Sequence, residues 1–410
     1  MTPQLKNSES IVFWTLCTMG LFAILSSTMS KNPVLPHFAE SLNTPEGFWT
    51  GVVAIASTIP GILISLPAGS LSDILGRRKV LLISSAIFAS APFLYLLINS
   101  WWQLILVRFY HGFATGMFVP VAEALIAETF PTKRGERISL FSSVTIVGRS
   151  IAPILGGSIL SVTNNNFHSL YLAVGAAGVT AFITALPFLR EKRRIAKKTE
   201  AFKKTTLKGI VHGWKSVAKA RGVLTVGFVE AIQYYTYGSV EFFFVKYMGD
   251  VINLDPFLQG AIMTSQLVVV MLSKPYFGRV SDRIGRRAPI ILGCIIGGAP
   301  LVAIPFSTEF PILLFLSVIY GLGFSLVTSS TPALVSELVP IEVVGSAMGL
   351  LSTIMDVGQT LGPVICSLIL VTSLSYKGLF SSLTFVLILS SIVFILSGIA
   401  ERQAGVERSV

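Results

Sequence analysis

The chain has 410 residues, of which 52% are hydrophobic and only 12% are charged, and its formal net charge is +11. Soluble domains carry about a quarter charged residues, so a soluble protein of this composition could not cover its surface with polar groups. The composition excludes an ordinary soluble domain and predicts an integral membrane protein. The positive charge then needs an explanation other than nucleic-acid binding.

Twelve apolar segments follow one another along the chain, and each can supply the roughly 20 helical residues that cross a bilayer. In chain order they cover residues 11–36, 49–71, 79–98, 102–130, 138–162, 169–189, 222–247, 258–280, 287–307, 311–338, 345–370 and 378–399. We therefore predict an all-α polytopic membrane protein. An even number of spans puts both termini on the same side of the membrane.

The distribution of Lys and Arg indicates which side that is. Of the 31 such residues, 25 lie in the termini and in the loops after even-numbered spans, whereas the opposite loops contain two. Because basic loops stay inside, we predict cytoplasmic termini in a multi-pass protein of the cell (plasma or inner) membrane. Residues 190–221 form a basic cytoplasmic linker, which divides the chain into domains 1–189 and 222–410.

One ten-residue pattern occurs twice, 209 residues apart. It reads GSLSDILGRR from residue 69 and GRVSDRIGRR from residue 278. The same offset relates Glu128 to Glu337, so each half contains the same six-helix unit. The paired motif positions are Gly69, Asp73, Gly76, Arg77 and Arg78 in the first copy and Gly278, Asp282, Gly285, Arg286 and Arg287 in the second.

A second set of small residues recurs in the fifth and eleventh spans. With one further residue of offset, Gly148 and Pro153 correspond to Gly358 and Pro363. Small residues let membrane helices approach closely, and proline weakens the local backbone, so we predict packing and bending positions there. This set also includes Gly156, Gly157 and Gly362.

These motifs resemble those of the major facilitator superfamily, and the resemblance covers essentially the whole chain. The repeated loop is similar to the superfamily's G-x-L-[SA]-D-x-x-G-R-[RK] signature, and residues 108–112 resemble its Arg-x-x-x-Gly motif. The fifth span resembles the motif of twelve-helix drug–proton antiporters, although Ala152 replaces the glycine before Pro153. The resemblance implies two pseudo-symmetric six-helix bundles and transport by alternating access.

The resemblance also implies a cytoplasmic gate built from both motif copies. We expect Asp73 at the start of the third membrane helix, where unpaired N–H groups favour a carboxylate. Glu128 is the expected partner of an arginine in the first copy, and Glu337 has the same role in the second.

The seventh span carries an unusual polar and aromatic face. Glu230, Gln233, Tyr234, Tyr237 and Glu241 fall within about 100° of arc on a helix. Two carboxylates at membrane depth favour a cavity wall that binds cations or protons, although a polar seam against another helix is the alternative. Other candidates for substrate binding or proton coupling are Arg108, His111, Glu123, Arg149, Asp356 and Gln359.

Asp356 and Glu230 are the leading candidates for the coupling proton. A carboxylate in apolar surroundings takes up a proton more readily than one in water. The first span has no acidic residue between Ile11 and Ala39, which departs from many drug–proton exporters. Proton-coupled export of amphipathic or cationic molecules is the favoured function. An uptake symporter or facilitator for a small organic anion or metabolite, using Arg108 and Arg149, is the alternative.

No motif favours an enzyme, since the sequence has neither a nucleotide-binding loop nor a metal-spaced His cluster. We therefore expect no cofactor and no metal. The expected partners are a small-molecule substrate, protons and the lipid bilayer, not nucleic acid, and the expected state is a monomer.

Overall fold

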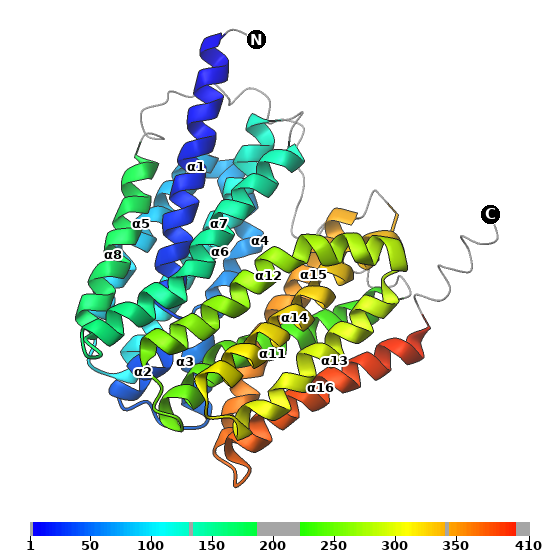
Figure 1. Cartoon of the computed structure of the whole chain (residues 1–410). Helices are drawn as coiled ribbons and strands as arrows, with labels where there is room; N and C mark the ends of the chain where they lie inside the picture. Colours follow the sequence, from blue (N-terminus) through cyan, green and yellow to red (C-terminus); the bar gives the residue numbers. More distant parts are fainter. Residues whose placement is uncertain (1–2, 131–133, 187–221, 341–343, 399–410) are drawn as a thin grey trace, which may run out of the picture. The chain divides into compact units, whose positions relative to one another are not determined.

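A computed structural model describes residues 3–130, 134–186, 222–340 and 344–398 of the chain (Figure 1). The predicted linker 190–221 lies outside these ranges. Contacts divide the chain into two units. The first comprises residues 1–44, 52–204 and 255–264, and the second comprises residues 45–51, 205–254 and 265–410.

Eight described helices, of which α2 and α3 are short, build the N-terminal unit together with residues 256–264; residues 48–51 of α3 belong to the other unit. Helix α1 packs against α7 and α8, and α5 packs against α6 and α8. The helices are α1 (Pro3–Met29), α2 (Val34–Ser41), α3 (Phe48–Ile55), α4 (Thr58–Leu75), α5 (Arg77–Tyr95), α6 (Trp101–Thr129), α7 (Arg134–Val162) and α8 (Phe167–Ala185).

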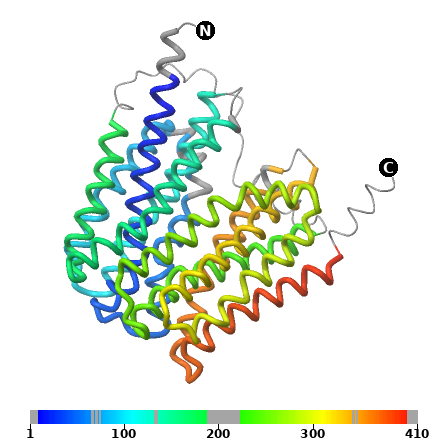
Figure 2. The backbone as a smooth tube through the Cα atoms, viewed as in Figure 1, coloured from blue at the N-terminus to red at the C-terminus, as the bar shows by residue number. Residues whose placement is uncertain are grey.

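The C-terminal unit repeats this pattern of packing, and Figure 2 traces its backbone in green to red. Helix α11 packs against α15, and α13 packs against α14 and α16. Its helices are α11 (Val223–Asp250), α12 (Pro256–Ile284) from residue 265 onward, α13 (Arg287–Ala303), the 3-10 turn η2 (Ile304–Phe306), α14 (Phe310–Leu338), α15 (Val344–Leu370) and α16 (Ser375–Ser397).

Ten helices of the described chain are long and apolar enough to cross a bilayer. The two other predicted spans differ for separate reasons. The second is divided into α3 and α4, and the seventh, α11, carries Glu230, Glu241, Lys246 and Asp250 within its 28 residues. Hydropathy alone therefore undercounts the helices that build the two bundles.

Two predicted boundaries were wrong. The first segment does not continue to residue 36, because α1 ends at Met29 and α2 begins after a turn. The second segment is not one helix, because a turn at Ala56 and Ser57 separates α3 from α4. Pro60 explains the break: it has no N–H for the carbonyl of residue 56, and its ring clashes with that carbonyl in a continuous helix.

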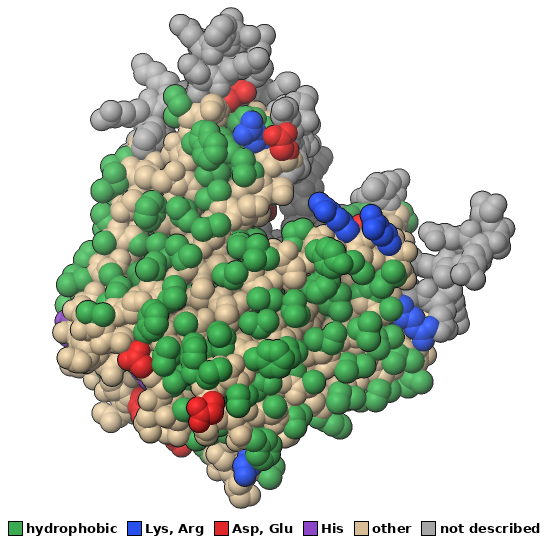
Figure 3. All heavy atoms as spheres, viewed as in Figure 1, with side chains coloured by type: hydrophobic (Ala, Val, Ile, Leu, Met, Phe, Trp, Pro, Cys, Tyr) green, Lys and Arg blue, Asp and Glu red, His purple; other side chains and the backbone are tan. Residues whose placement is uncertain are grey.

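Each unit has its own apolar core. Phe13, Phe88 and Phe118 are fully buried in the first, and Ile290, Val327 and Leu334 are fully buried in the second. Outward-facing positions are apolar as well, including Leu106, Leu272 and Phe385, which are 60%, 68% and 65% exposed. Figure 3 shows hydrophobic side chains spread over the visible surface, with few charged groups among them. Such a surface is stable in lipid rather than in water.

Candidate functional site

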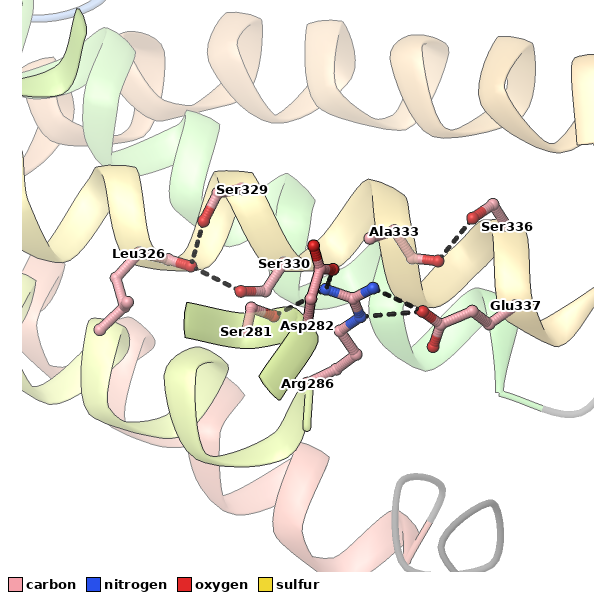
Figure 4. A network of polar contacts seen from close by, with 9 residues as sticks. All are labelled: Ser281, Asp282, Arg286, Leu326, Ser329, Ser330, Ala333, Ser336 and Glu337. Carbon is pink, nitrogen blue, oxygen red and sulfur yellow. Dashed lines mark hydrogen bonds and ion pairs between the residues drawn. The ribbon is translucent and has the colours of Figure 1, made fainter. Parts of the chain in front are cut away.

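The second motif copy forms a network around one arginine, between the end of α12 and the end of α14 (Figure 4). Arg286 donates through Nε and Nη2 to Glu337 Oε1, at 2.9 and 2.7 Å. Its Nη1 donates to Ser281 Oγ at 3.1 Å and pairs with Asp282 Oδ1 at 2.5 Å. One guanidinium therefore joins the last turn of α12 to α14.

The first motif copy repeats this arrangement. Arg77 donates through Nε and Nη2 to Glu128 Oε1, at 3.1 and 3.0 Å, and through Nη1 to Ser72 Oγ. Here the guanidinium joins the last turn of α4 to the end of α6. The side chain of Asp73 is not among those that the structure describes.

The expected position of the motif aspartates was wrong. Asp73 lies in the last turn of α4 and Asp282 in the last turn of α12, so neither begins the following helix. A carboxylate at a helix C-terminus faces the unfavourable end of the dipole, and for Asp282 the guanidinium of Arg286 compensates. No role was predicted for Ser72 and Ser281, although these two serines are related by the 209-residue offset.

The pKa of Arg286 is set by two opposing effects. Burial alone would lower it, but the hydrogen bonds and charges of Glu337 and Asp282 raise it above its ordinary value. A raised pKa on a cation means that its stabilising contribution is complete below the unfolded pKa and is lost only at still more alkaline pH. Arg286 therefore holds the network together throughout the physiological range.

A glycine makes the sharp turn between the two helices in each copy. Gly76 has φ 96° and ψ 133°, and Gly285 has φ +87°. L-amino acids rarely adopt a φ in this range, because Cβ then crowds the backbone. A Cβ at Gly76 would meet no other atom within 4 Å, so backbone conformation alone requires the glycine.

We expect Gly76→Ala to lower the free energy of unfolding by about 1–3 kcal/mol, the usual cost of a strained backbone. Gly61→Ala is the matched control, because a Cβ there also meets nothing within 4 Å but the residue is helical. Denaturation of both variants in mixed micelles measures the difference. Equal stabilities would show that the turn relaxes without strain.

Arg108 holds the break between α3 and α4. Its side chain is 1% exposed, and it donates from Nε to Val53 O at 2.9 Å and from Nη2 to Ala54 O at 3.3 Å and Ser57 Oγ at 2.9 Å. These carbonyls end α3, where the helix dipole is negative and favours a cation. The structure therefore places Arg108 on backbone carbonyls, and a role in binding substrate remains a prediction.

The other half of the chain supports this explanation of the break. At the 209-residue offset Pro60 corresponds to Val269 and Arg108 to Ser317, and α12 is continuous. The packing contact is nevertheless shared: a Cβ on Gly112 would lie 2.2 Å from Ser57 O, and one on Gly321 would lie 2.9 Å from Gln266 O. A glycine allows close helix approach in both halves, whereas the arginine is present only in the half whose helix is interrupted.

The predicted face of α11 is turned toward α13 and α14. Glu230 is 3% exposed and accepts a hydrogen bond of 2.5 Å from Thr331 Oγ1 of α14. Gln233 is 2% exposed and donates to Cys294 Sγ of α13 at 3.4 Å. At Glu230 and Gln233, the contacts therefore match the alternative interpretation, in which polar side chains of this helix pack against neighbouring helices.

The two tyrosines of this face, Tyr234 and Tyr237, belong to an aromatic cluster that also contains Tyr320 and Phe324 of α14. Tyr237 stacks on Phe324 with ring centroids 4.9 Å apart, and Tyr234 lies 5.4 Å from Phe324. Tyr320 is 2% exposed, and its hydroxyl makes no hydrogen bond within the described part of the chain. Glu241, the last residue of this face, is 7% exposed.

The other candidates occupy differing environments. His111 is buried, with Nδ1 3.5 Å from the hydroxyl of Tyr95, whereas Arg149 is exposed. Glu123, Asp356 and Gln359 are half-buried, on α6 in the first case and on α15 in the other two.

The predicted small residues lie where helices approach most closely. A Cβ on Gly148 of α7 would lie 2.6 Å from Leu21 O of α1. Cβ atoms on Gly358 and Gly362 of α15 would each lie 2.1 Å from α11 carbonyls, those of Ala231 and Tyr235. Leu21 and Ala231 are themselves 210 residues apart, so the duplicated halves share this contact. Gly156 approaches Met29, Gly157 approaches Pro256, and Pro153 and Pro363 lie within their helices.

A family model described as Major Facilitator Superfamily matches residues 16–245 and 226–408, which together span nearly the whole chain. The chain belongs to this superfamily. It is thus a multi-pass membrane transporter and not an enzyme, and the predicted twelve-helix fold and family are confirmed.

Curated relatives of this superfamily member include proteins named for drug efflux. The multi-drug resistance efflux pump PmrA homolog of Lactococcus lactis is 26% identical over 368 residues, which cover 86% of each chain. The multidrug resistance protein MdtG of Enterobacter lignolyticus is 24% identical over 375 residues, covering 88% of this chain and 87% of the relative.

Two solved structures of proteins named as transporters, or as homologues of one, share the fold. A bacterial homologue of the human lysosomal transporter Spinster has a TM-score of 0.76 at 12% identity and covers 98% of both chains. The nucleoside transporter NupG has a TM-score of 0.75 at 13% identity, covering 93% of this chain and 98% of the other. At these identities the likeness shows the fold alone.

Proposed function

We propose that this transporter exports amphipathic or cationic small molecules in exchange for protons, by alternating access across the cell membrane with both termini in the cytoplasm. The observation that carries the proposal is the face of α11, where the aromatic cluster lies beside the carboxylates of Glu230 and Glu241. Aromatic faces and carboxylates both attract cations with apolar bodies. The curated relatives named for multidrug efflux support the same substrate class.

The alternative, an organic-anion carrier that uses Arg108 and Arg149, has less support. The guanidinium of Arg108 already donates to two carbonyls and one hydroxyl within its own unit. An anion would have to displace these bonds, and the carbonyls at the end of α3 would then lose their guanidinium donors. Of these two arginines, only Arg149 is exposed, and it could still bind an anion in this alternative function.

The proposal is tested with purified protein in liposomes, using ethidium as a lipophilic fluorescent cation and a pH gradient across the bilayer. We expect the gradient to accelerate ethidium movement, and the accelerated flux to saturate with ethidium concentration. Flux that ignores the gradient would contradict proton coupling, and saturable flux of an organic anion in its place would favour the alternative.

A substitution at Glu230 tests whether its carboxylate carries the coupling proton. Glu230→Gln retains an acceptor for Thr331 but cannot exchange a proton, so we expect gradient-driven flux to fall about tenfold, equivalent to about 1.4 kcal/mol. Exchange of labelled for unlabelled substrate without a gradient should continue.

The matched control is Glu309→Gln, which neutralises an exposed carboxylate of the same unit that is not among the candidates. If Glu230→Gln keeps its response to the gradient and Asp356→Asn loses it, Asp356 carries the proton instead. If neither variant changes the response, proton coupling through these two carboxylates is wrong.

A further inference from the structure

An arginine near the start of α7 is held in place by two aromatic rings of the N-terminal unit. The guanidinium carbon of Arg137 lies 4.8 Å from the ring centroid of Phe13 in α1 and 5.2 Å from that of Phe130 at the end of α6. The two rings meet edge to face, with centroids 5.7 Å apart. Cations are attracted to such rings, so both contacts restrict where the guanidinium lies. Helices α1 and α7 run side by side below this corner (Figure 1).

The hydrogen-bond donors of this arginine are not used by the part of the chain that the structure describes. Within that part, Arg137 makes neither a hydrogen bond nor an ion pair. The residue is half-buried: its Nε is enclosed without a partner, but neither Nη is enclosed in this way. Glu136 projects about 100° away around the helix, and Glu128 is paired with Arg77. The two terminal NH2 groups can therefore donate to an acceptor from outside the chain.

An exposed apolar stripe runs along α7 from this arginine. Its members are Leu140, Val147, Ile151 and Leu155, which are 37%, 45%, 39% and 41% exposed. On a helix these four side chains and Arg137 fall within about 80° of arc. Residues 136–162 of α7 are long and apolar enough to span a membrane, and an exposed apolar face on such a helix is stable against acyl chains rather than water. Arg137 therefore lies at one end of a lipid-facing stripe.

An exposed tryptophan indicates the depth of this end in the membrane. Trp14 is 55% exposed and lies edge to face with Phe13, at 5.5 Å between centroids. Exposed tryptophans are enriched at the level of the lipid headgroups. Long cationic side chains near helix ends extend to the same level. The guanidinium held by Phe13 is therefore positioned among headgroups and not among acyl chains.

The duplicated half of the chain keeps the stripe. At the 210-residue offset that relates α7 to α15, its last three members correspond to exposed apolar residues, which are 44%, 50% and 42% exposed: Val357, Leu361 and Ile365. An apolar outer face is thus a shared property of the two related helices.

The same half lacks the arginine and its rings. The offsets of 210 residues for α1 and α7 and 209 for α6 relate Phe13 to Val223, Arg137 to Ala347 and Phe130 to Val339. These three counterparts are 2%, 0% and 8% exposed and belong to one apolar cluster: Val223, Ala347 and Val339. The repeated fold therefore closes this corner without a cation, and packing alone does not explain Arg137.

We propose that Arg137 binds the phosphate group of an anionic phospholipid whose acyl chains lie along the exposed stripe of α7. A guanidinium matches a phosphate in charge and in the geometry of two parallel hydrogen bonds. Because the rings already fix the side chain, less conformational freedom is lost on binding. The stripe favours a lipid over a soluble anion. The site lies on the outer face of the N-terminal unit and does not depend on which substrate or ion the transporter moves.

The test titrates the full-length protein in dodecyl maltoside micelles with dioleoyl phosphatidylglycerol and counts bound lipids by native mass spectrometry. We expect Arg137→Gln to weaken the tightest site about tenfold, the effect of charge-assisted hydrogen bonds. Arg137→Lys keeps the cation without the paired donors, so its loss should be smaller, and it preserves the test if the glutamine variant does not fold. Arg283→Gln is the matched control, because it removes an exposed arginine from the end of α12, and it should bind like the wild type.

Two further ligands distinguish the source of the phosphate. Dioleoyl phosphatidylcholine has no net charge and should bind more weakly, and inorganic phosphate at millimolar concentration should not displace the bound lipid. Displacement by inorganic phosphate would show a site for soluble anions and overturn the proposal. Equal affinity for the two lipids, equal affinity of the wild type and both Arg137 variants, or an equal loss in Arg283→Gln would each overturn it as well.

Discussion

Replacing Arg108 with methionine should destabilise the N-terminal unit by about 2–6 kcal/mol. The variant removes the guanidinium donors to the buried carbonyls of Val53 and Ala54 and leaves Val53 O with a long bond of 3.5 Å from Ala56 N, at about 1–3 kcal/mol for each carbonyl. Water cannot replace the lost bonds within the hydrocarbon region of a bilayer. The measurement is the free energy of unfolding in mixed micelles.

Two further variants separate structure from substrate binding at this site. Arg149→Met removes an exposed arginine of the same unit and should leave stability almost unchanged. Arg108→Lys keeps one cation that can reach fewer acceptors than the planar guanidinium, so its loss should be intermediate. If Arg108→Met were as stable as the wild type but lost substrate binding, the arginine would act as an anion ligand, as in the alternative function.

The break in the second span shows where sequence reasoning stops. Residues 49–71 are uniformly apolar, so hydropathy predicts one uninterrupted helix there. The two signals that explain the break are Pro60 and Arg108, which lie 48 residues apart. Local patterns cannot reveal that an arginine of α6 satisfies the carbonyls of α3, because that contact exists only in the folded bundle.

The two motif copies were more predictable, because duplication provides an internal comparison. Arg77 and Glu128 are 51 residues apart, as are Arg286 and Glu337, and each pair is bonded in the structure. The place of the aspartates was wrong because the sequence does not mark whether a helix ends before or after them. Gly76 and Gly285, with their positive φ, fix that boundary.

The sequence predicted which side chains of α11 share one face, but not which residues of other helices they contact. Helical periodicity placed five side chains on one face, and those side chains contact α13 and α14. That Thr331 meets Glu230 could not be predicted, since 101 residues separate them and many hydroxyls of the C-terminal half could have filled that place.

Replacing Arg286 with glutamine should reduce transport about tenfold or more. This guanidinium joins α12 to α14 through Glu337 while it also holds Ser281 and Asp282 (Figure 4). If the network stabilises one state of the transport cycle, its loss shifts the populations of the states by the coupling energy, and about 1.4 kcal/mol corresponds to a tenfold shift. The rate of ethidium transport in liposomes measures the effect, with Arg283→Gln as the control for losing an exposed positive charge from the last turn of α12.

A double-mutant cycle with Glu337→Gln tests whether the contact itself is responsible. Because Glu337 is 40% exposed, we expect a coupling energy of only about 1 kcal/mol, within the range for partly solvated ion pairs. Additive losses would mean that the two residues act independently and would contradict a gate built on their bond. Arg77→Gln should have an effect similar to that of Arg286→Gln, since Arg77 makes the same contacts with Ser72 and Glu128. If only one of the two substitutions reduced the transport rate, the two motif copies would differ in their importance for transport despite their similar geometry.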